Sequence, residues 1–551
     1  MKKGTKYIAA SLVGGLLSFS ACTDNFVSDN KSKTAFTDEL QEYDFQKYLL
    51  KFEIMQTGIY FNYNWGGGYN WPFQVMQNLG QDMFSGYFHD MNNAFNDKNS
   101  SYALNDGWTS SNWNNTYKYI MPEVIKCEAI NAKQPALLGI AKIQKVALMH
   151  RISDIYGPLV YSKFGSEGNN VDSQEGAYKQ FFGDLDNSVK LLTDFMKSNP
   201  GVEPFADADI LMPAGNRTLV QWVKFANSLR LRLAIRISNV SKTLAASETK
   251  KALEQANGLL ENAEETVAVS TAEGKYSNPL GEIGQSWGEV YMGATMESLL
   301  TGYQDPRAAK YYSAAVGGDI TWQAAGGQTG SLKELFPTKG MYKGIPQGTN
   351  ITTADNRYKF HARSNVTQET NAILMTAAEV WFLRAEAALR GFSSEDSKQC
   401  YETGIKTSFK QWGVSGAEEY LISHNKPTDY KDAFDAKYNM PARILTTPNW
   451  SDAGSKEEQL EKIITQKWLA CYPEGCEAWT EQRRTGYPKL FKVLVNNSGG
   501  AINTDDMIRR IPFPVNLQKS SPTQYGALKA ALGGADTGGT RLWWDADKNN
   551  F

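Results

Sequence analysis

Long segments with an apolar residue at every third or fourth position recur along this chain, and they limit its fold more than any other property. Such spacing places the apolar side chains on one face of an amphipathic helix. Segments 136–156, 219–240 and 460–468 follow this pattern. In residues 176–197 the stripe consists of Tyr178, Phe181, Phe182, Leu185, Val189, Leu192, Phe195 and Met196. We therefore predict a mainly helical fold.

Segment 373–391 adds a second pattern, in which small alanines alternate with large residues such as Trp381 and Leu389. Small residues opposite large ones allow paired helices to approach closely, as they do in helical-repeat proteins. Gly391 supplies the expected stop of this helix. We expect a scaffold of stacked helix pairs, although no strict repeat of 34 residues identifies it from periodicity alone.

Three long stretches separate the predicted helices, at about 61–118, 266–365 and 491–551. They are rich in Gly, Asn, Trp and Tyr. Loops of this length within a compact protein usually carry function. The sequence therefore predicts a large loop-rich half that binds a ligand.

The N-terminus has the pattern of an export signal. Three lysines precede an uncharged stretch, residues 7–21, that is shorter than the roughly 20 residues needed to cross a bilayer. Residues 19–22 resemble a bacterial lipobox, which implies cleavage before Cys22 and lipidation of its thiol. We predict a lipoprotein signal peptide at 1–21, a lipidated flexible stalk at 22–38 and a single domain at 39–551. The alternative is ordinary cleavage with Cys22 unmodified.

The charge balance excludes a typical nucleic-acid-binding protein. Loss of the three N-terminal lysines reduces 57 basic residues to 54 against 59 acidic ones, a net charge of −5, and the pI is about 6.2. Besides the signal segment, no apolar run approaches the length of a membrane span. We therefore expect a soluble body that is tethered to a membrane through lipid.

Cysteine and histidine are sparse, so we predict no transition-metal site. The mature chain keeps Cys127, Cys400, Cys471 and Cys476. Cys471 and Cys476 are close enough in sequence to form a disulfide across a short loop. The alternative is that both are free or buried thiols.

Seven segments in order along the chain together resemble the SusD/RagB-like family, in its SusD-like branch. They are SDIYGPLVYS (153–162), WVKFANSLRLRLAIRIS (222–238), DPR (305–307), ILMTAAEVWFLRAEAAL (373–389), IITQKWLACYPEGCEAWTEQRRTGYPKL (463–490), RRIPFP (509–514) and LWWD (542–545). The resemblance covers nearly the whole mature chain. It implies tetratricopeptide-like helix pairs that carry an irregular, loop-rich ligand-binding half.

The resemblance also implies a function. Members of this family are outer-membrane, cell-surface lipoproteins of Gram-negative bacteria that deliver glycans, or in some members peptides, to a SusC-like TonB-dependent barrel. We expect a nutrient-binding protein without enzymatic activity and without a cofactor, and the sequence leaves a bound calcium ion open. A peptide-binding member of the family is the main alternative.

Aromatic residues among Gly, Asn and Asp are the expected ligand contacts, since a sugar offers an apolar face and an edge of hydroxyls. Two regions have this composition, at 60–74 with 104–117, and at 284–291 with a Gly- and Gln-rich loop near 322. The predicted contacts are Trp65, Tyr69, Asn105, Asp106, Trp108, Asn112, Trp113, Trp287, Tyr291 and Trp322. The competing interpretation is that these aromatic residues are buried core.

The charged motifs are predicted to be structural, and an enzyme is the less favoured interpretation. Arg230, Arg232, Arg483 and Arg484 suit buried pairing with carbonyls or with carboxylates such as Glu477. The G-x-S-x-G pattern at 284–288 would make Ser286 an esterase nucleophile, with His361 or His424 as base, but the preceding residues do not form the strand that such a site needs. A surface glycosidase would need two carboxylates across a cleft, which the sequence alone does not reveal.

Overall fold

The computed structural model describes residues 46–65, 68–90, 98–168, 170–324, 326–336, 340–349, 357–547 and 549–551. The predicted signal peptide, the lipidation site Cys22 and the stalk lie outside these residues. The chain divides after Leu50, so that Lys51–Phe551 forms one compact unit. Helix α3 (Gln46–Leu49) is the described part of the other unit.

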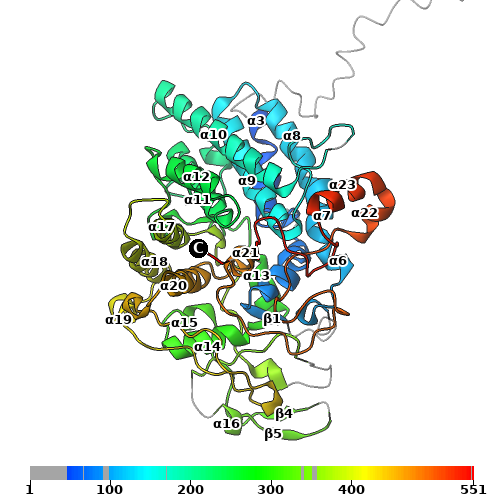
Figure 1. Cartoon of the computed structure of the whole chain (residues 1–551), viewed down its shortest axis with the longest axis vertical. Coiled ribbons are helices and arrows are strands. Elements are labelled where there is room, and N and C mark those ends of the chain that lie inside the picture. Colours follow the sequence, from blue (N-terminus) through cyan, green and yellow to red (C-terminus); the bar gives the residue numbers. More distant parts are fainter. Residues whose placement is uncertain are drawn as a thin grey trace, which may run out of the picture. The chain divides into compact units, whose positions relative to one another are not determined.

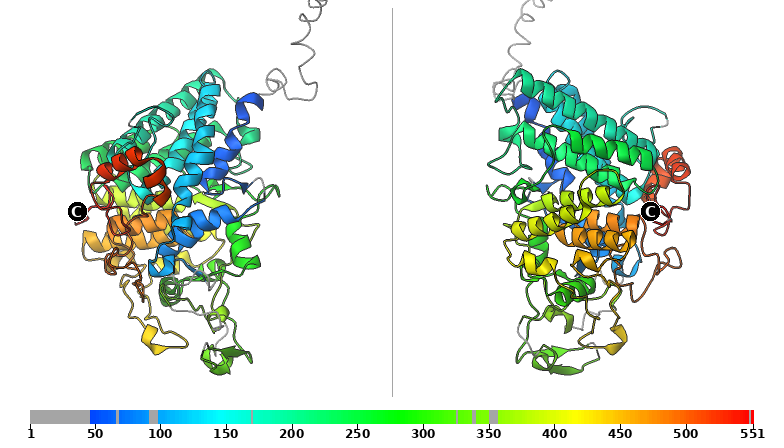
Figure 2. Two further views of the ribbon diagram at one scale, coloured as in Figure 1. Left: turned by 90° about the vertical axis from the view of Figure 1, so that its right-hand side faces the viewer. Right: turned by 60° about the vertical axis from the view of Figure 1, so that its left-hand side comes forward.

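The unit from Lys51 is built mainly of helices, as predicted (Figure 1). Consecutive helices pack as pairs, α9 with α10, α11 with α12, and α17 with α18. In Figure 2 the cyan and green helices α9–α12 lie above the yellow-green and orange helices α17, α18, α20 and α21. The scaffold helices are α4 (Phe52–Ile59), α8 (Met121–Ile130), α9 (Pro135–Tyr156), α10 (Gln174–Ser198), α11 (Leu219–Arg236), α12 (Lys242–Glu254), α17 (Ala377–Leu389), α18 (Ser397–Gln411), α20 (Lys456–Ala470) and α21 (Gly475–Thr485).

Small residues bring paired helices together where the sequence places them opposite large ones. A Cβ added to Gly404 of α18 would lie 2.8 Å from the Phe382 ring of α17. A Cβ added to Gly139 of α9 would lie 3.2 Å from the Leu192 side chain of α10. These contacts are tighter than ordinary van der Waals contacts, so a larger side chain would force the helices apart.

The helix predicted at 373–391 begins later in the structure than the sequence pattern indicates. Residues 372–375 form strand β6 (Ala372–Met375), which pairs antiparallel with β2 (Val267–Val269), and helix α17 starts only at Ala377. The Thr376 side chain accepts a hydrogen bond from the Glu379 backbone N–H, so it caps the helix. All four residues of the apolar run 372–375 are buried, and a short buried apolar run suits a strand as well as a helix.

Short helices and strands connect the scaffold helices, and most of them lie in the three stretches predicted as loop-rich. Three π-helices are present among the described residues, η3 (Gln74–Asp82), η5 (Thr116–Ile120) and η8 (Glu282–Ser286). The short α-helices are α5 (Trp71–Phe73), α6 (Asp106–Thr109), α7 (Ser111–Asn115), α13 (Pro279–Gly281), α14 (Ala294–Tyr303), α15 (Ala308–Tyr311), α16 (Leu332–Leu335), α19 (Ala417–Leu421), α22 (Val515–Ser520) and α23 (Pro522–Leu532). The remaining strands form two antiparallel pairs, β1 (Phe88–Asp90) with β3 (Val290–Met292) and β4 (Thr321–Gln323) with β5 (Thr329–Ser331). Single 3₁₀ turns are η4 (Asn99–Ser101), η6 (Ala206–Ala208), η7 (Ala263–Glu265), η9 (Arg357–Phe360), η10 (Ala436–Tyr438) and η11 (Trp450–Asp452).

A buried network of ion pairs joins helices α9, α11, α17, α20 and α21. Its contacts include Arg236 Nη2–Glu477 Oε2 at 2.6 Å, Lys467 Nζ–Glu477 Oε1 at 2.7 Å and Arg484 Nη2–Glu386 Oε2 at 2.7 Å. The arginines predicted to be structural are therefore buried in the scaffold. Glu477 pairs with Arg232 at 3.6 Å as well as with Arg236 and Lys467. Arg484 pairs instead with Glu386 and Glu481. Arg483 bonds to the carbonyls of Trp479 and Arg509.

The four cysteines of the domain are buried and free. The structure therefore contradicts the disulfide between Cys471 and Cys476 and agrees with the alternative of two buried thiols. Cys471 follows the last residue of α20 and Cys476 lies in the first turn of α21. Burial raises the pKa of the Cys476 thiol to about 12, so this thiol is uncharged at neutral pH.

Candidate ligand-binding surface

Trp71 is a large exposed aromatic residue held by a well-packed neighbour. It begins helix α5 and is 43% exposed, whereas Pro72 and Phe73 after it are buried. Proline suits the first turn of a helix because no intrahelical partner is needed for its missing N–H. Phe73 stacks on Tyr60 with ring centroids 4.8 Å apart. This anchor leaves the Trp71 ring at the surface.

Trp287 lies at the turn between π-helix η8 and buried strand β3, and it is 41% exposed. Its backbone N–H donates to the Glu282 carbonyl at 3.1 Å, which ends the π-helix. Gly288 follows with a φ of +71°, a conformation that favours glycine. The chain then enters β3 at Val290, which is buried. The turn therefore holds the Trp287 ring outside the core.

A hydrogen bond joins the two segments that carry these tryptophans. Gln74 Nε2 donates to Glu289 Oε2 at 2.5 Å. Gln74 lies three residues after Trp71, and Glu289 lies two residues after Trp287. Bonds to a charged group are stronger than bonds between neutral groups. The two exposed indoles are therefore carried by segments that are held side by side.

Further aromatic rings extend this surface. The Tyr63 ring meets the Trp71 ring edge-on at 6.5 Å and stacks on Tyr119 at 4.5 Å. Tyr69, in the loop before α5, is 53% exposed. We call Tyr63, Tyr69, Trp71, Tyr119 and Trp287 the aromatic surface. Of these, Tyr69 and Trp287 are among the predicted contacts. Trp71 is one of the aromatic residues that the sequence singles out in 60–74, with burial in the core as the alternative. Tyr63 and Tyr119 were not predicted, because only packing separates them from the buried aromatics nearby.

Four predicted ligand contacts are buried in the core, namely Trp65, Asn112, Trp113 and Tyr291. The Trp65 indole stacks against Tyr60 at 5.4 Å, and its Nε1 donates to the Ser277 carbonyl at 2.8 Å. A buried ring offers no face to a ligand, so these assignments are corrected. Trp65 instead holds the segment before α5 against the segment before α13.

The other buried side chains have equally clear packing partners. Trp113 meets the rings of Tyr156 and Phe513 edge-on at 5.4 and 5.5 Å. Tyr291 forms a core cluster with Ile345 and Tyr358. Aromatic side chains bury large areas, which explains why composition alone does not separate core rings from surface rings.

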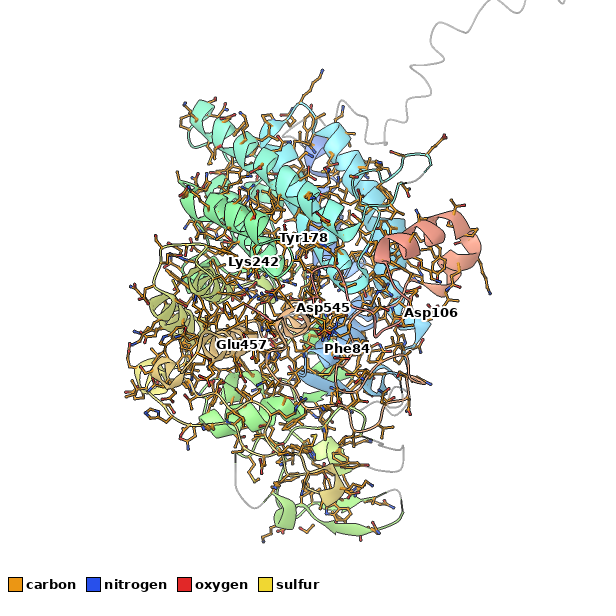
Figure 3. All side chains as sticks on the ribbon, viewed as in Figure 1. Phe84, Asp106, Tyr178, Lys242, Glu457 and Asp545 are labelled. Atoms are coloured by element: carbon orange, nitrogen blue, oxygen red, sulfur yellow. The ribbon has the colours of Figure 1, made fainter. Side chains whose placement is uncertain are left out.

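Asn105, Asp106 and Trp108 form a separate group at helix α6. Asn105 Oδ1 accepts from the Gly107 N–H at 2.9 Å and caps the helix. Asp106 Oδ1 accepts from the backbone N–H of Val515 at 3.1 Å, so it lies beside α22 and α23 (Figure 3). Trp108 is half-buried. Their role in ligand binding stays a prediction.

Trp322 lies in strand β4, at the end of this unit farthest from α10 (Figure 1). It is half-buried, meets the Phe434 ring at 5.7 Å and covers Gly330 of β5, where an added Cβ would lie 2.5 Å from the indole. The predicted contact residues therefore do not form one cluster.

Ser286 does not have the surroundings of an esterase nucleophile. It ends π-helix η8, which follows helix α13 and not a strand. Its hydroxyl donates to Glu282 Oε2 at 2.9 Å. His361 is buried against aromatic rings, and His424 pairs with Asp452 at 2.9 Å. The geometry contradicts the strand–turn–helix arrangement that the G-x-S-x-G motif requires.

Within the described part of the chain, no group of three or more His, Cys, Asp or Glu side chains is arranged to hold a metal ion. In the same residues, no helix has the length and apolarity needed to span a membrane.

Comparison with known proteins decides the family. The family model described as "SusD-like: Susd and RagB outer membrane lipoprotein" matches residues 29–545. The chain belongs to the SusD-like family. The resemblance drawn from the seven sequence segments is thereby confirmed. The family is one of outer-membrane lipoproteins, as its description states.

Solved structures of SusD homologues superpose on most of this SusD-like chain. A homologue from Bacteroides vulgatus is 52% identical, covering 93% of this chain and 100% of that chain with a TM-score of 0.84. A chitin-binding homologue from Flavobacterium johnsoniae is 35% identical, covering 92% and 100% with a TM-score of 0.82. A homologue from Bacteroides thetaiotaomicron is 30% identical, covering 91% and 99% with a TM-score of 0.78. The predicted tetratricopeptide-like helix pairs are confirmed. No curated protein matches the chain.

Proposed function

We propose that this SusD-like protein binds an oligosaccharide or polysaccharide at the aromatic surface and does not cleave it. The observation that carries the proposal is the pair of exposed indoles, Trp71 and Trp287, on segments joined by the Gln74–Glu289 hydrogen bond. An exposed ring plane suits the C–H face of a sugar, and polar groups at its edge suit the hydroxyls.

Polar groups lie close to Trp287 in the sequence and at the surface. Gln285 and Ser286 directly precede it and are exposed. The Gln285 side chain is oriented by donating to the Ser364 carbonyl at 2.7 Å, and the Ser286 hydroxyl is oriented by Glu282. Side chains that are held in place lose little conformational entropy when they bind a ligand. They provide hydroxyl partners beside the stacking plane.

The similarity to a chitin-binding homologue supports a carbohydrate ligand and suggests which glycans to test first. We propose chitin oligosaccharides as the first glycans to test. Peptide binding is the second candidate, because exposed tryptophans also anchor peptide side chains.

The decisive experiment is calorimetric titration of the mature chain with chitin oligosaccharides, other polysaccharides and peptides. We expect Trp71→Ala and Trp287→Ala each to weaken glycan binding by about 1 to 3 kcal/mol, the typical effect of losing an aromatic anchor. Phe551→Ala is the matched control, since Phe551 is an aromatic residue that is also 41% exposed and contacts Arg390 on the scaffold. Wild-type affinity in both tryptophan variants would refute the proposal.

Two further measurements test the remaining parts of this function. Trp108→Ala examines the predicted contacts at α6, and unchanged affinity would remove Trp108 from the site. Assay for released reducing sugar separates binding from hydrolysis, and any turnover would contradict the proposed absence of enzymatic activity.

We further propose that lipid on Cys22 holds the protein at the outer membrane, where it passes its ligand to a SusC-like TonB-dependent transporter. The family description, an outer-membrane lipoprotein, supports this. Cys22→Ala should release the protein from the membrane fraction. The wild-type protein should co-purify with a barrel when membranes are dissolved in detergent. Recovery of the protein without any barrel would contradict the partnership.

A further inference from the structure

A polar cavity of about 240 Å³ lies at the C-terminal end of helix α21, away from the residues of the aromatic surface. Its described lining comes from residues 443, 482–486, 489–490, 505–507, 509, 541, 546–547 and 550. Arg509, the first residue of the RRIPFP motif, lines the cavity and donates to Asp545, the last residue of the LWWD motif. Among the described residues, six cationic side chains line the cavity, namely Arg443, Arg483, Arg484, Lys489, Arg509 and Arg541.

Most of these cations are already neutralised by carboxylates. Arg484 pairs with Glu386 and Glu481. Arg509 donates from Nε to Asp545 Oδ2 at 2.8 Å, and Asp545 lies beside α21 (Figure 3). Arg541 pairs with Asp506, Asp545 and Asp547, and Lys489 pairs with Glu461 at 3.4 Å.

Arg483 is different, because its guanidinium contacts only neutral oxygens among the described residues. Its Nη1 donates to the Arg509 carbonyl at 2.8 Å, its Nη2 to Thr480 Oγ1 at 2.9 Å, and its Nε to the Trp479 carbonyl at 3.4 Å. The side chain is 1% exposed and its guanidinium lies 3.5 Å from the centroid of the Trp479 ring. A guanidinium has five N–H donors, so two remain after these three bonds.

Arg443 at the side of the cavity also lacks a carboxylate within ion-pair distance in the described chain. Its Nη1 donates to the Leu490 carbonyl. In the described part of the lining there are three carboxylates, and each already has a cation. Asp505 pairs with Lys492, and Asp506 and Asp547 pair with Arg541.

Among the described residues, two guanidiniums of this cavity therefore have no carboxylate within ion-pair distance, and one of them, Arg483, is fully buried. Burial lowers the pKa of Arg483 to about 9, which leaves the guanidinium charged at neutral pH. A buried guanidinium that no carboxylate contacts directly is unfavourable, and an anion in contact with it would relieve this cost. The negative end of the α21 dipole lies here, but Arg483 and Arg484 in its last turn offset it.

We propose that this cavity binds an oxyanion group, a carboxylate, sulfate or phosphate, between Arg483 and Arg443. Arginine is suited to such groups because its planar fork forms two parallel hydrogen bonds to their oxygens. The group comes either from an acidic sugar of a bound glycan or from a free inorganic anion. The site uses none of the residues of the aromatic surface, so it stands independently of the function proposed for that surface.

The test is calorimetric titration of the mature chain with sodium sulfate, sodium phosphate and sodium glucuronate, with sodium chloride keeping the ionic strength constant. Glucose, which resembles glucuronate but has no charge, serves as the neutral probe. We expect saturable binding of at least one anion and none of the neutral sugar at this site. Tighter binding of glucuronate identifies a glycan carboxylate, whereas tighter binding of sulfate or phosphate identifies a free anion.

Arg443→Gln should weaken anion binding at least tenfold, because it removes one of the two guanidiniums that have no carboxylate within ion-pair distance. Lys489→Gln, at the exposed side of the cavity, is the second variant and should weaken binding to a smaller degree even if Arg443→Gln fails to fold. Arg217→Gln is the matched control, since Arg217 pairs with Glu273 outside the cavity. The proposal is overturned if no anion binds saturably, or if the two cavity variants bind as the wild type does.

Discussion

Arg232 of α11 and Glu379 of α17 form a two-point ion pair in the middle of the helical scaffold. Arg232 Nε lies 2.7 Å from Glu379 Oε1, and Arg232 Nη2 lies 2.6 Å from Glu379 Oε2. Both side chains are at least 95% buried. The pair joins two helices that are 147 residues apart in the sequence, so it fixes how successive helix pairs stack.

Loss of one partner of this pair is expected to destabilise the fold strongly. Arg232→Met leaves the Glu379 carboxylate buried with only the more distant Lys467, at 3.7 Å, and should lower the free energy of unfolding by about 3 to 5 kcal/mol. The double variant Arg232→Met/Glu379→Leu should recover a large part of this loss, because no buried charge is left alone. Guanidinium denaturation of the wild type, the single variant and the double variant measures these changes in the free energy of unfolding. A double variant no more stable than the single one would contradict this explanation.

Gly281 controls the position of the segment that carries Trp287. A Cβ added to Gly281 would lie 2.2 Å from the Thr367 carbonyl carbon, which is backbone and does not move easily. Gly281→Ala should cost about 1 to 3 kcal/mol of stability and should weaken glycan binding by shifting η8. Gly183→Ala in helix α10 is the control, because nothing lies within 4 Å of its added Cβ. It should stabilise the protein by up to about 1 kcal/mol and leave affinity unchanged. Thermal unfolding and calorimetry together test both variants.

The Gln74–Glu289 hydrogen bond should contribute more to ligand binding than to folding. Glu289→Gln keeps the size of the side chain but removes its charge, so the bond from Gln74 weakens. Hydrogen bonds to charged groups contribute about 1.5 to 3 kcal/mol, and those between neutral groups about 1. We expect a two- to tenfold loss of glycan affinity with a small change in melting temperature. Hydrogen exchange should report faster opening at residues 283–289, and unaltered exchange there would argue against the coupling.

His89 makes the stability of the protein sensitive to acid. It is fully buried in strand β1, and neither ring nitrogen has a hydrogen-bond partner among the described residues. Burial lowers the pKa of His89 to about 4, from about 6.5 in the unfolded chain. The folded state therefore binds this proton more weakly than the unfolded state does. The contribution of His89 to the free energy of unfolding is fully present above pH 6.5. It falls as the pH drops from 6.5 to 4, by about 3 kcal/mol in total.

Urea denaturation at pH 7.5 and pH 4.5 checks this expectation. His89→Leu should lose less stability between the two pH values than the wild type does. Some dependence should persist, because burial also lowers the pKa of His150 and His361. Equal losses in both proteins would show that His89 does not contribute.

The helical scaffold was predictable because its signal is local. The apolar stripe of residues 176–197 lies within helix α10 (Gln174–Ser198), and helix α9 ends at Tyr156 before a glycine with a φ of +95°. Residues 372–375 were predicted less well, because a short apolar run fits a buried strand and a helix equally. These residues form a strand because they pair with β2, which lies about a hundred residues earlier in the sequence.

The ligand-binding surface was less predictable. Trp65 and Trp71 lie six residues apart in a stretch of one composition, yet Trp65 is 3% exposed and Trp71 is 43% exposed. The difference arises from partners distant in sequence. The Trp65 indole donates to Ser277, and Phe73 stacks on Tyr60, which turns the Trp71 ring outward.

The sequence by itself therefore determined the helix class, the burial of the motif arginines and the family to which the chain belongs. These depend on spacing along the chain and on motifs that are contiguous in it. Only the tertiary structure decided which aromatic rings reach the surface and which arginines lack a carboxylate. Both properties depend on side chains brought together from remote segments, and the local sequence carries no record of those contacts.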